Sequence, residues 1–85
     1  MLSLPSRRTL ALLDIMFASA DALEVGMDSL EAWSSKTLWS LSDALERRWM
    51  TERETDDGVV YTLTKLGRRE VDAYQRLLRG EASGL

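Results

Sequence analysis

The stretch SKTLWSLSDALERRWMTERETDDGVVYTL, residues 35–63, decides the fold because its periodicity changes halfway along. In its first half, leucines recur at i, i+3 and i+7, a spacing that places them on one face of a helix. These leucines are Leu38, Leu41 and Leu45. We therefore expect a helix over residues 35–48, with Ser35 as its N-cap and with polar side chains on the face opposite the leucines.

In the second half of this stretch, apolar and polar residues alternate with a period of two, which is typical of strands. Two strands are expected, over residues 49–55 and 59–63. Between them lies Asp56-Asp57-Gly58, a strong hairpin signal because acidic residues and glycine favour tight turns. The side chains expected on the buried face of the second strand are Val59, Tyr61 and Leu63.

Upstream of residue 35 the sequence predicts two further helices. The first covers about residues 6–20, where apolar residues again recur at helical spacing. Its stripe consists of Leu10, Leu13, Phe17 and Ala20. Residues 21–26 are interpreted as a connector, with a sharp bend at Gly26. A short helix over about residues 29–33 follows, with Asp28 as its expected N-cap.

Downstream of the hairpin, Thr64 is expected to cap a last helix that runs to about Arg79. Its apolar stripe consists of Val71, Tyr74 and Leu78. The domain is expected to span residues 1–80, with residues 81–85 as a flexible tail. The resulting order is helix, helix, helix, hairpin, helix. It predicts an α+β, mainly α, winged helix-turn-helix with three helices, a two-stranded wing and a C-terminal helix.

The composition argues against several classes of protein. A chain of 85 residues is one domain, and 45% apolar with 29% charged residues is typical of a folded one. The chain contains no cysteine and no histidine. It therefore lacks disulfides, thiolate metal ligands, and the commonest general base. We expect no enzyme activity, no catalytic residue, no metal and no cofactor.

The N-terminal region also bears on where the protein works. Arg7 and Arg8 precede an apolar stretch that loosely imitates a secretory signal. Asp14 interrupts that stretch, and its apolar residues follow helical spacing rather than a continuous run. No run approaches the roughly 18 apolar residues of a membrane span. We therefore expect a cytoplasmic protein that makes no contact with membranes.

Two stretches of the chain resemble PadR-like and MarR-like bacterial regulators. Residues 37–50 are similar to the pattern T-L-Y-x-x-L-x-x-L-E-x-x-G-L-I, and residues 57–69 are similar to D-G-R-x-x-Y-x-L-T-x-x-G-R. The similarity spans roughly residues 9–78. It implies a repressor-type, DNA-binding protein that works as a homodimer. Two residues depart from the pattern. Trp49 stands where the families usually have a small or apolar residue after a glycine turn, and Val59 stands where an arginine or lysine is common.

On this reading, the third helix enters the major groove of double-stranded DNA. Its N-terminal lysine is suited to a phosphate or a guanine edge, and its serines are suited to phosphate. The residues expected to contact DNA are Ser35, Lys36, Thr37, Trp39, Ser40 and Arg47 on this helix, Arg53 in the hairpin, and Arg68 and Arg69 in the last helix. The alternative for the helical set is an ordinary solvated face.

The aromatic residues and the apolar stripes suggest how two chains would join. Trp33 and Trp49 are expected in the core. Trp39 lies at the edge of the buried stripe, where a core role is favoured and a dimer contact or a stacking surface stays open. Because a core this small is thin, the first and last helices are expected to form a homodimer interface. The expected interface residues are Leu10, Leu13, Phe17, Val71, Tyr74 and Leu78.

The charge of the chain supports a second hypothesis. The formal net charge is −3 and the isoelectric point is about 4.8, whereas DNA binding gains much of its affinity from basic residues. The expected hairpin carries Glu52, Glu54, Asp56 and Asp57 against a single arginine. The alternative function is therefore a winged-helix protein-interaction module, an antirepressor or assembly adaptor, whose acidic wing meets a basic protein partner.

Overall fold

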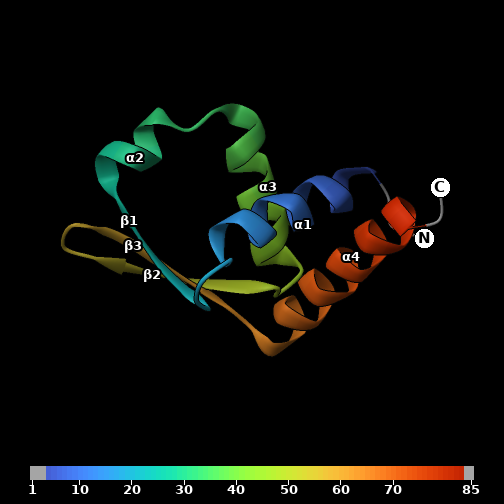
Figure 1. The fold of residues 1–85 in the computed structure, drawn as a ribbon. Coiled ribbons are helices and arrows are strands. Elements are labelled where there is room, and N and C mark those ends of the chain that lie inside the picture. The colour runs from blue at the N-terminus through green and yellow to red at the C-terminus, as the bar shows by residue number, and fades with distance from the viewer. Residues whose placement is uncertain (1–3, 84–85) are drawn as a thin grey trace.

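The computed structural model describes the backbone of residues 4–83 and the side chains of residues 7–80 (Figure 1). Within these residues the protein is a small α+β domain with four helices and a three-stranded antiparallel sheet. The elements in chain order are α1 (Leu4–Met16), β1 (Ala22–Gly26), α2 (Met27–Ala32), α3 (Ser35–Glu46), β2 (Met50–Thr55), β3 (Gly58–Leu63) and α4 (Lys65–Ser83). The predicted hairpin and the predicted third and last helices are confirmed, with boundaries shifted by a few residues.

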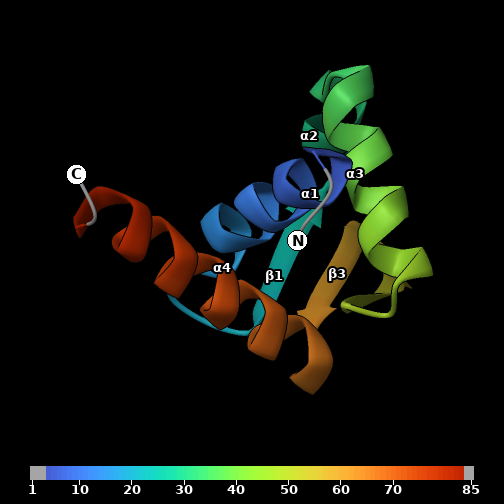
Figure 2. The ribbon, with the colours of Figure 1, turned by 90° about the vertical axis from the view of Figure 1, so that its right-hand side faces the viewer.

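The sheet has the strand order β1-β3-β2, so β3 pairs with both of its neighbours. Tyr61 stands opposite Leu23 in β1 and opposite Glu52 in β2. Residues paired in this way share a face of the sheet. The face that carries Tyr61 also carries the buried Met50 and Leu63, and the helices gather on this side (Figure 2).

The core forms where α1 packs against both α3 and α4. Leu10, Leu13 and Phe17 from α1 are almost completely buried, as are Val71 and Tyr74 from α4. Burial of a large apolar side chain contributes about 1.5–3 kcal/mol. These five side chains are therefore used within one chain, and the prediction that they form a dimer interface is wrong. Of the predicted set, Leu78 alone is exposed.

The interpretation of residues 21–26 as a connector is wrong, because residues 22–26 form β1 along the free side of β3. The first helix ends at Met16, four residues earlier than predicted, and the following residues turn the chain towards this strand. Close pairing of β1 depends on Gly58. A Cβ atom at this position would lie 2.1 Å from the carbonyl oxygen of Val25, which is too close for any larger residue.

Two of the predicted helix caps are also corrected. α2 begins at Met27, so Asp28 lies inside its first turn, and no side chain caps its start. α3 is capped by Ser34 rather than Ser35, because the Ser34 hydroxyl accepts a hydrogen bond from the Thr37 N–H at 3.3 Å. The two helices are joined by Trp33 and Ser34, a connection short enough to fix their relative orientation.

The turn from α3 into β2 ends the helix with two hydrogen bonds of the Schellman type. The Arg48 N–H donates to the Leu45 carbonyl at 3.1 Å, and the Trp49 N–H donates to the Ala44 carbonyl at 3.0 Å. Arg48 has a φ of 61° and is the one non-glycine residue with a positive φ in the part of the chain described. Glycine is usual at this position, because a side chain in the left-handed region costs about 1–2 kcal/mol.

Thr64 confirms its predicted role as the cap of α4. Its hydroxyl oxygen accepts a hydrogen bond from the Gly67 N–H at 3.0 Å, and the hydroxyl donates to the Arg48 carbonyl at 2.7 Å. The start of α4 is thereby fixed against the turn that follows α3. The helix continues to Ser83, so residues 81–83 of the predicted tail are helical, and residues 84–85 lie outside the described residues. None of the helices described is both long and apolar enough to cross a membrane.

Candidate nucleic-acid interface

Helix α3 presents one row of exposed side chains to solvent. The members of this row are spaced by four, three and four residues, and they are Ser35, Trp39, Ser42 and Glu46. The flank of α3 that faces α1 carries Lys36, Asp43 and Arg47, and Asp43 accepts a hydrogen bond from the hydroxyl of Thr9 at 2.6 Å. α1 therefore fixes the orientation of α3 and leaves the outer row of α3 accessible.

The predicted contacts on α3 divide into accessible and inaccessible residues. Ser35 and Lys36 are exposed, and Trp39 is 51% exposed, so the favoured core role of Trp39 is wrong. Ser40 is only 6% exposed, because it lies on the side of the helix that faces α1. Thr37 is half-buried beside the Ser34 cap. The prediction of direct DNA contact is therefore wrong for Ser40.

Arg47 is accessible, but two interactions within the chain hold its guanidinium. Its Nε donates to both carboxylate oxygens of Asp43, at 3.0 and 3.1 Å. The guanidinium carbon also lies 5.0 Å from the centre of the Trp49 ring, within the range of a cation–π contact. Because Asp43 compensates its charge, Arg47 is a weaker attractor of phosphate than the sequence suggests.

Arg68 is held in the same way and is corrected from a DNA contact to a structural residue. Its guanidinium forms an ion pair with Asp21, pairs at 3.7 Å with Asp72, and donates to the Phe17 carbonyl at 3.0 Å. The hydrogen bond to Asp21 is the main cause that raises the pKa of Arg68 above its ordinary value. This network connects α4 to the segment between α1 and β1.

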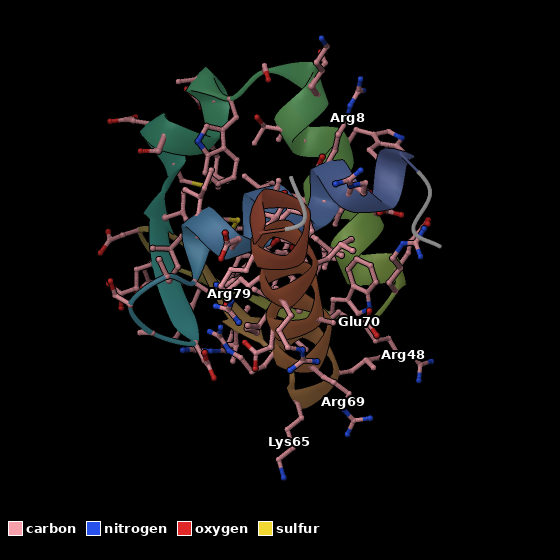
Figure 3. All side chains as sticks on the ribbon, turned by 45° about the vertical axis from the view of Figure 1, so that its right-hand side comes forward. Arg8, Arg48, Lys65, Arg69, Glu70 and Arg79 are labelled. Carbon is pink, nitrogen blue, oxygen red and sulfur yellow. The ribbon has the colours of Figure 1, made fainter. Side chains whose placement is uncertain are left out.

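A basic cluster that the sequence analysis missed lies at the end of α3. It is formed by Arg48, Lys65 and Arg69 (Figure 3). The hydrogen bond from Thr64 to the Arg48 carbonyl brings the α3–β2 turn against the start of α4, where Lys65 and Arg69 are one helical turn apart. Among the side chains of residues 7–80, none of the three pairs with a carboxylate. The available signal was an arginine at a helix-ending position where glycine is common.

A second basic group lies at the N-terminal end of α3. Arg8 and Lys36 line an open cavity of about 200 Å³, together with Ser35, Trp39 and Ser40. Along one edge of the molecule, which we call the basic edge, Figure 3 shows Arg8 at the top and Arg48, Arg69 and Lys65 towards the bottom, with Glu70 close to Arg48. α3 is therefore bordered at both of its ends by cations that form no ion pair with the carboxylates of residues 7–80.

The hairpin has the opposite character. Glu52, Glu54, Asp56 and Asp57 are all exposed, and none forms an ion pair within the described side chains. Arg53 is also exposed, but strand alternation places it on the other face of the hairpin from its two glutamate neighbours. The hairpin thus carries four exposed negative charges, whereas exposed cations border α3 where it lies beside α1 and the start of α4.

No family model, curated protein or solved structure matches this chain. The function is therefore inferred from the arrangement of its own residues. An exposed helical row that combines two hydroxyls, an indole and one carboxylate, with cations at both ends that pair with no carboxylate among the side chains of residues 7–80, suits a ligand that is long and negatively charged.

Replacing Arg48 with glycine is expected to have opposite effects on stability and on DNA affinity. Glycine relieves the left-handed strain, and we expect the free energy of unfolding to rise by about 0.5–1 kcal/mol in urea denaturation. DNA affinity is expected to fall because one cation of the basic cluster is lost. Arg48→Lys is the matched control, since it keeps both the strain and the charge. If Arg48→Gly binds DNA as tightly as the wild type, Arg48 does not contact DNA.

Proposed function

We propose that this chain is a winged helix-turn-helix protein that binds double-stranded DNA as a homodimeric transcriptional regulator. The observation that carries the proposal is the exposed outer row of α3, bordered by Arg8 and Lys36 at one end and by the Arg48 cluster at the other. The short connection between α2 and α3, followed directly by the hairpin, supports this assignment. The resemblance of residues 37–50 to PadR-like and MarR-like regulators supports it as well.

In this proposal, the outer row of α3 enters the major groove. Ser35, Trp39 and Ser42 face the base edges, where hydroxyls act as donors or acceptors and the indole contacts thymine methyl groups. Lys36 reaches a phosphate or a guanine at the edge of the groove. The cations at the two ends of the helix bind the phosphates on either side and fix the register of the protein on the duplex.

The hairpin is assigned a different place from the one that wings commonly take. In the place that wings commonly take, beside the DNA backbone, the hairpin carboxylates would lie close to phosphates, and like charges repel. We therefore place DNA against α3 and the basic edge shown in Figure 3, with the acidic hairpin turned away from the duplex backbone. Arg53 belongs to the hairpin, so it is not expected to contribute to DNA affinity.

Enrichment of duplexes from a random DNA pool tests this proposal. The protein is immobilised and challenged with the pool through several rounds, and the bound duplexes are sequenced. We expect a common motif to emerge, and we expect Lys36→Ala and Ser42→Ala to change that motif or to weaken its enrichment. A pool that stays random after selection contradicts sequence-specific DNA binding.

A protein-interaction module is the second candidate, and the unpaired acids of the hairpin favour it. In that case the protein would not bind DNA even at low salt, and neutralising Glu52, Glu54, Asp56 and Asp57 together would abolish binding of a basic protein partner. If the duplex is the ligand, the same four substitutions leave salt-dependent DNA binding detectable, because these acids lie outside the proposed DNA contact of each chain.

A further inference from the structure

A groove opens between the hairpin and the helices α2 and α3. Its floor is formed by Val59, which is half-buried, and by the edge of Tyr61, whose ring is buried and stacks on Trp33. Leu38 and Met27 form its helical wall, and they are 46% and 54% exposed. The groove has a volume of about 430 Å³. Large apolar side chains thus stay accessible beside a floor continuous with the core.

The opposite wall of this groove is acidic. Glu52 and Glu54 pair with Tyr61 and Val59 across the hairpin, so their side chains share the apolar face of the sheet. Asp56 extends the wall into the turn. Burial, and to a smaller extent the charge of Glu52, raises the pKa of the Tyr61 hydroxyl. The groove therefore suits an apolar segment that brings its own positive charge.

The C-terminal half of α4 has that chemistry. Ala73 and Leu77 are one turn apart on its outer surface, and Leu77 is 43% exposed. Arg76 lies beside Leu77 on the helix surface, with Arg79 one turn further on, and both are exposed. None of the described carboxylates pairs with either arginine. This segment thus exposes an apolar pair of side chains beside two cations that have no carboxylate partner among residues 7–80.

We propose that two copies of this chain associate by placing the Ala73–Arg79 face of one copy's α4 in the acidic groove of the other copy. Leu77 fills the apolar floor beside Leu38 and Met27, and Arg76 and Arg79 pair with Glu52 and Glu54. The proposal replaces the predicted interface, whose residues are buried within one chain. It does not depend on DNA binding.

The shape of the molecule allows this contact to be reciprocal. The domain is 47 Å long, with the hairpin at one end and α4 towards the other (Figure 1). Two copies placed side by side in opposite directions bring each groove to the other copy's α4. The contact then forms twice around a twofold axis, and the assembly closes as a dimer.

Charge reversal tests this arrangement, with mass measured by light scattering and sedimentation over a concentration series without DNA. We expect the wild type to reach twice the 9.6 kDa of one chain. Glu52→Arg/Glu54→Arg and Arg76→Glu/Arg79→Glu should each weaken self-association by about 10-fold or more. An equimolar mixture of the two variants should restore the dimer, because each groove then meets an α4 of opposite charge.

Two controls separate this contact from general effects. Glu24→Arg/Glu46→Arg makes the same change in net charge at exposed sites outside the groove, and it should leave the dimer intact. Arg76→Gln/Arg79→Gln repeats the α4 test without placing acids near a helix C-terminus, and thermal unfolding verifies that each variant is folded. A wild type that stays monomeric at about 100 µM overturns the proposal. So does a dimer that withstands both charge reversals, or a mixture that fails to recover.

Discussion

Gly67→Ala is expected to destabilise the protein by about 3 kcal/mol or more, which is a large fraction of the stability of a domain this small. A Cβ atom at position 67 would lie 1.9 Å from the Trp49 carbonyl oxygen and 2.7 Å from a methyl carbon of Leu63. The carbonyl belongs to the backbone of the α3–β2 turn, so it cannot move aside as a flexible side chain would. The start of α4 would have to separate from that turn.

Gly80→Ala in the same helix is the matched control. A Cβ atom at position 80 would meet nothing within 4 Å, and alanine favours the helix over glycine by about 0.5–1 kcal/mol. In urea denaturation followed by circular dichroism, the midpoint urea concentration should therefore fall for Gly67→Ala and rise for Gly80→Ala. If Gly67→Ala unfolds at the same urea concentration as the wild type, α4 does not pack against the turn in the way described.

The second large effect is expected from the basic cluster at the end of α3. Replacing Arg48, Lys65 and Arg69 together with glutamine should lower DNA affinity on the order of 100-fold at about 0.1 M salt. Each cation that neutralises a phosphate contributes roughly −0.9 to the slope of log K against log salt concentration. The slope of the triple variant should therefore be shallower by about 2.7 than that of the wild type.

The control for this triple variant is Arg53→Gln, which removes an exposed cation that lies outside both the proposed DNA contact and the acidic groove. The salt slope of this control should stay close to that of the wild type. A triple variant with an unchanged slope would show that the cluster does not touch phosphate, even if its overall affinity had fallen.

The elements predicted correctly from sequence are those whose signal is local. Helix α3 follows from leucine spacing, the hairpin from alternation around Asp56-Asp57-Gly58, and the start of α4 from Thr64. β1 was missed because only Leu23 and Val25 alternate there, and its hydrogen bonds come from β3, more than thirty residues away. Such a strand is defined by its partner rather than by its own pattern.

The site was harder to predict because it depends on which side of each helix is covered. An apolar stripe indicates burial without saying whether the cover comes from the same chain, so Leu10 and Val71 were assigned to a dimer interface although they form the core. Arg68 was assigned to DNA although Asp21, far away in sequence, holds it. Arg48 and Lys65 join one cluster through the hydrogen bonds of Thr64 to the carbonyls of Arg48 and Trp49, which no spacing rule reveals.

The central claim is that α3 and the basic edge beside it bind double-stranded DNA. The most direct test is fluorescence anisotropy of a labelled duplex carrying the selected motif, titrated with the protein from about 50 to 200 mM salt. We predict saturable binding that weakens steeply with salt and that exceeds binding to a scrambled duplex at the highest salt. No binding at the lowest salt, or equal binding to both duplexes throughout, would contradict the claim.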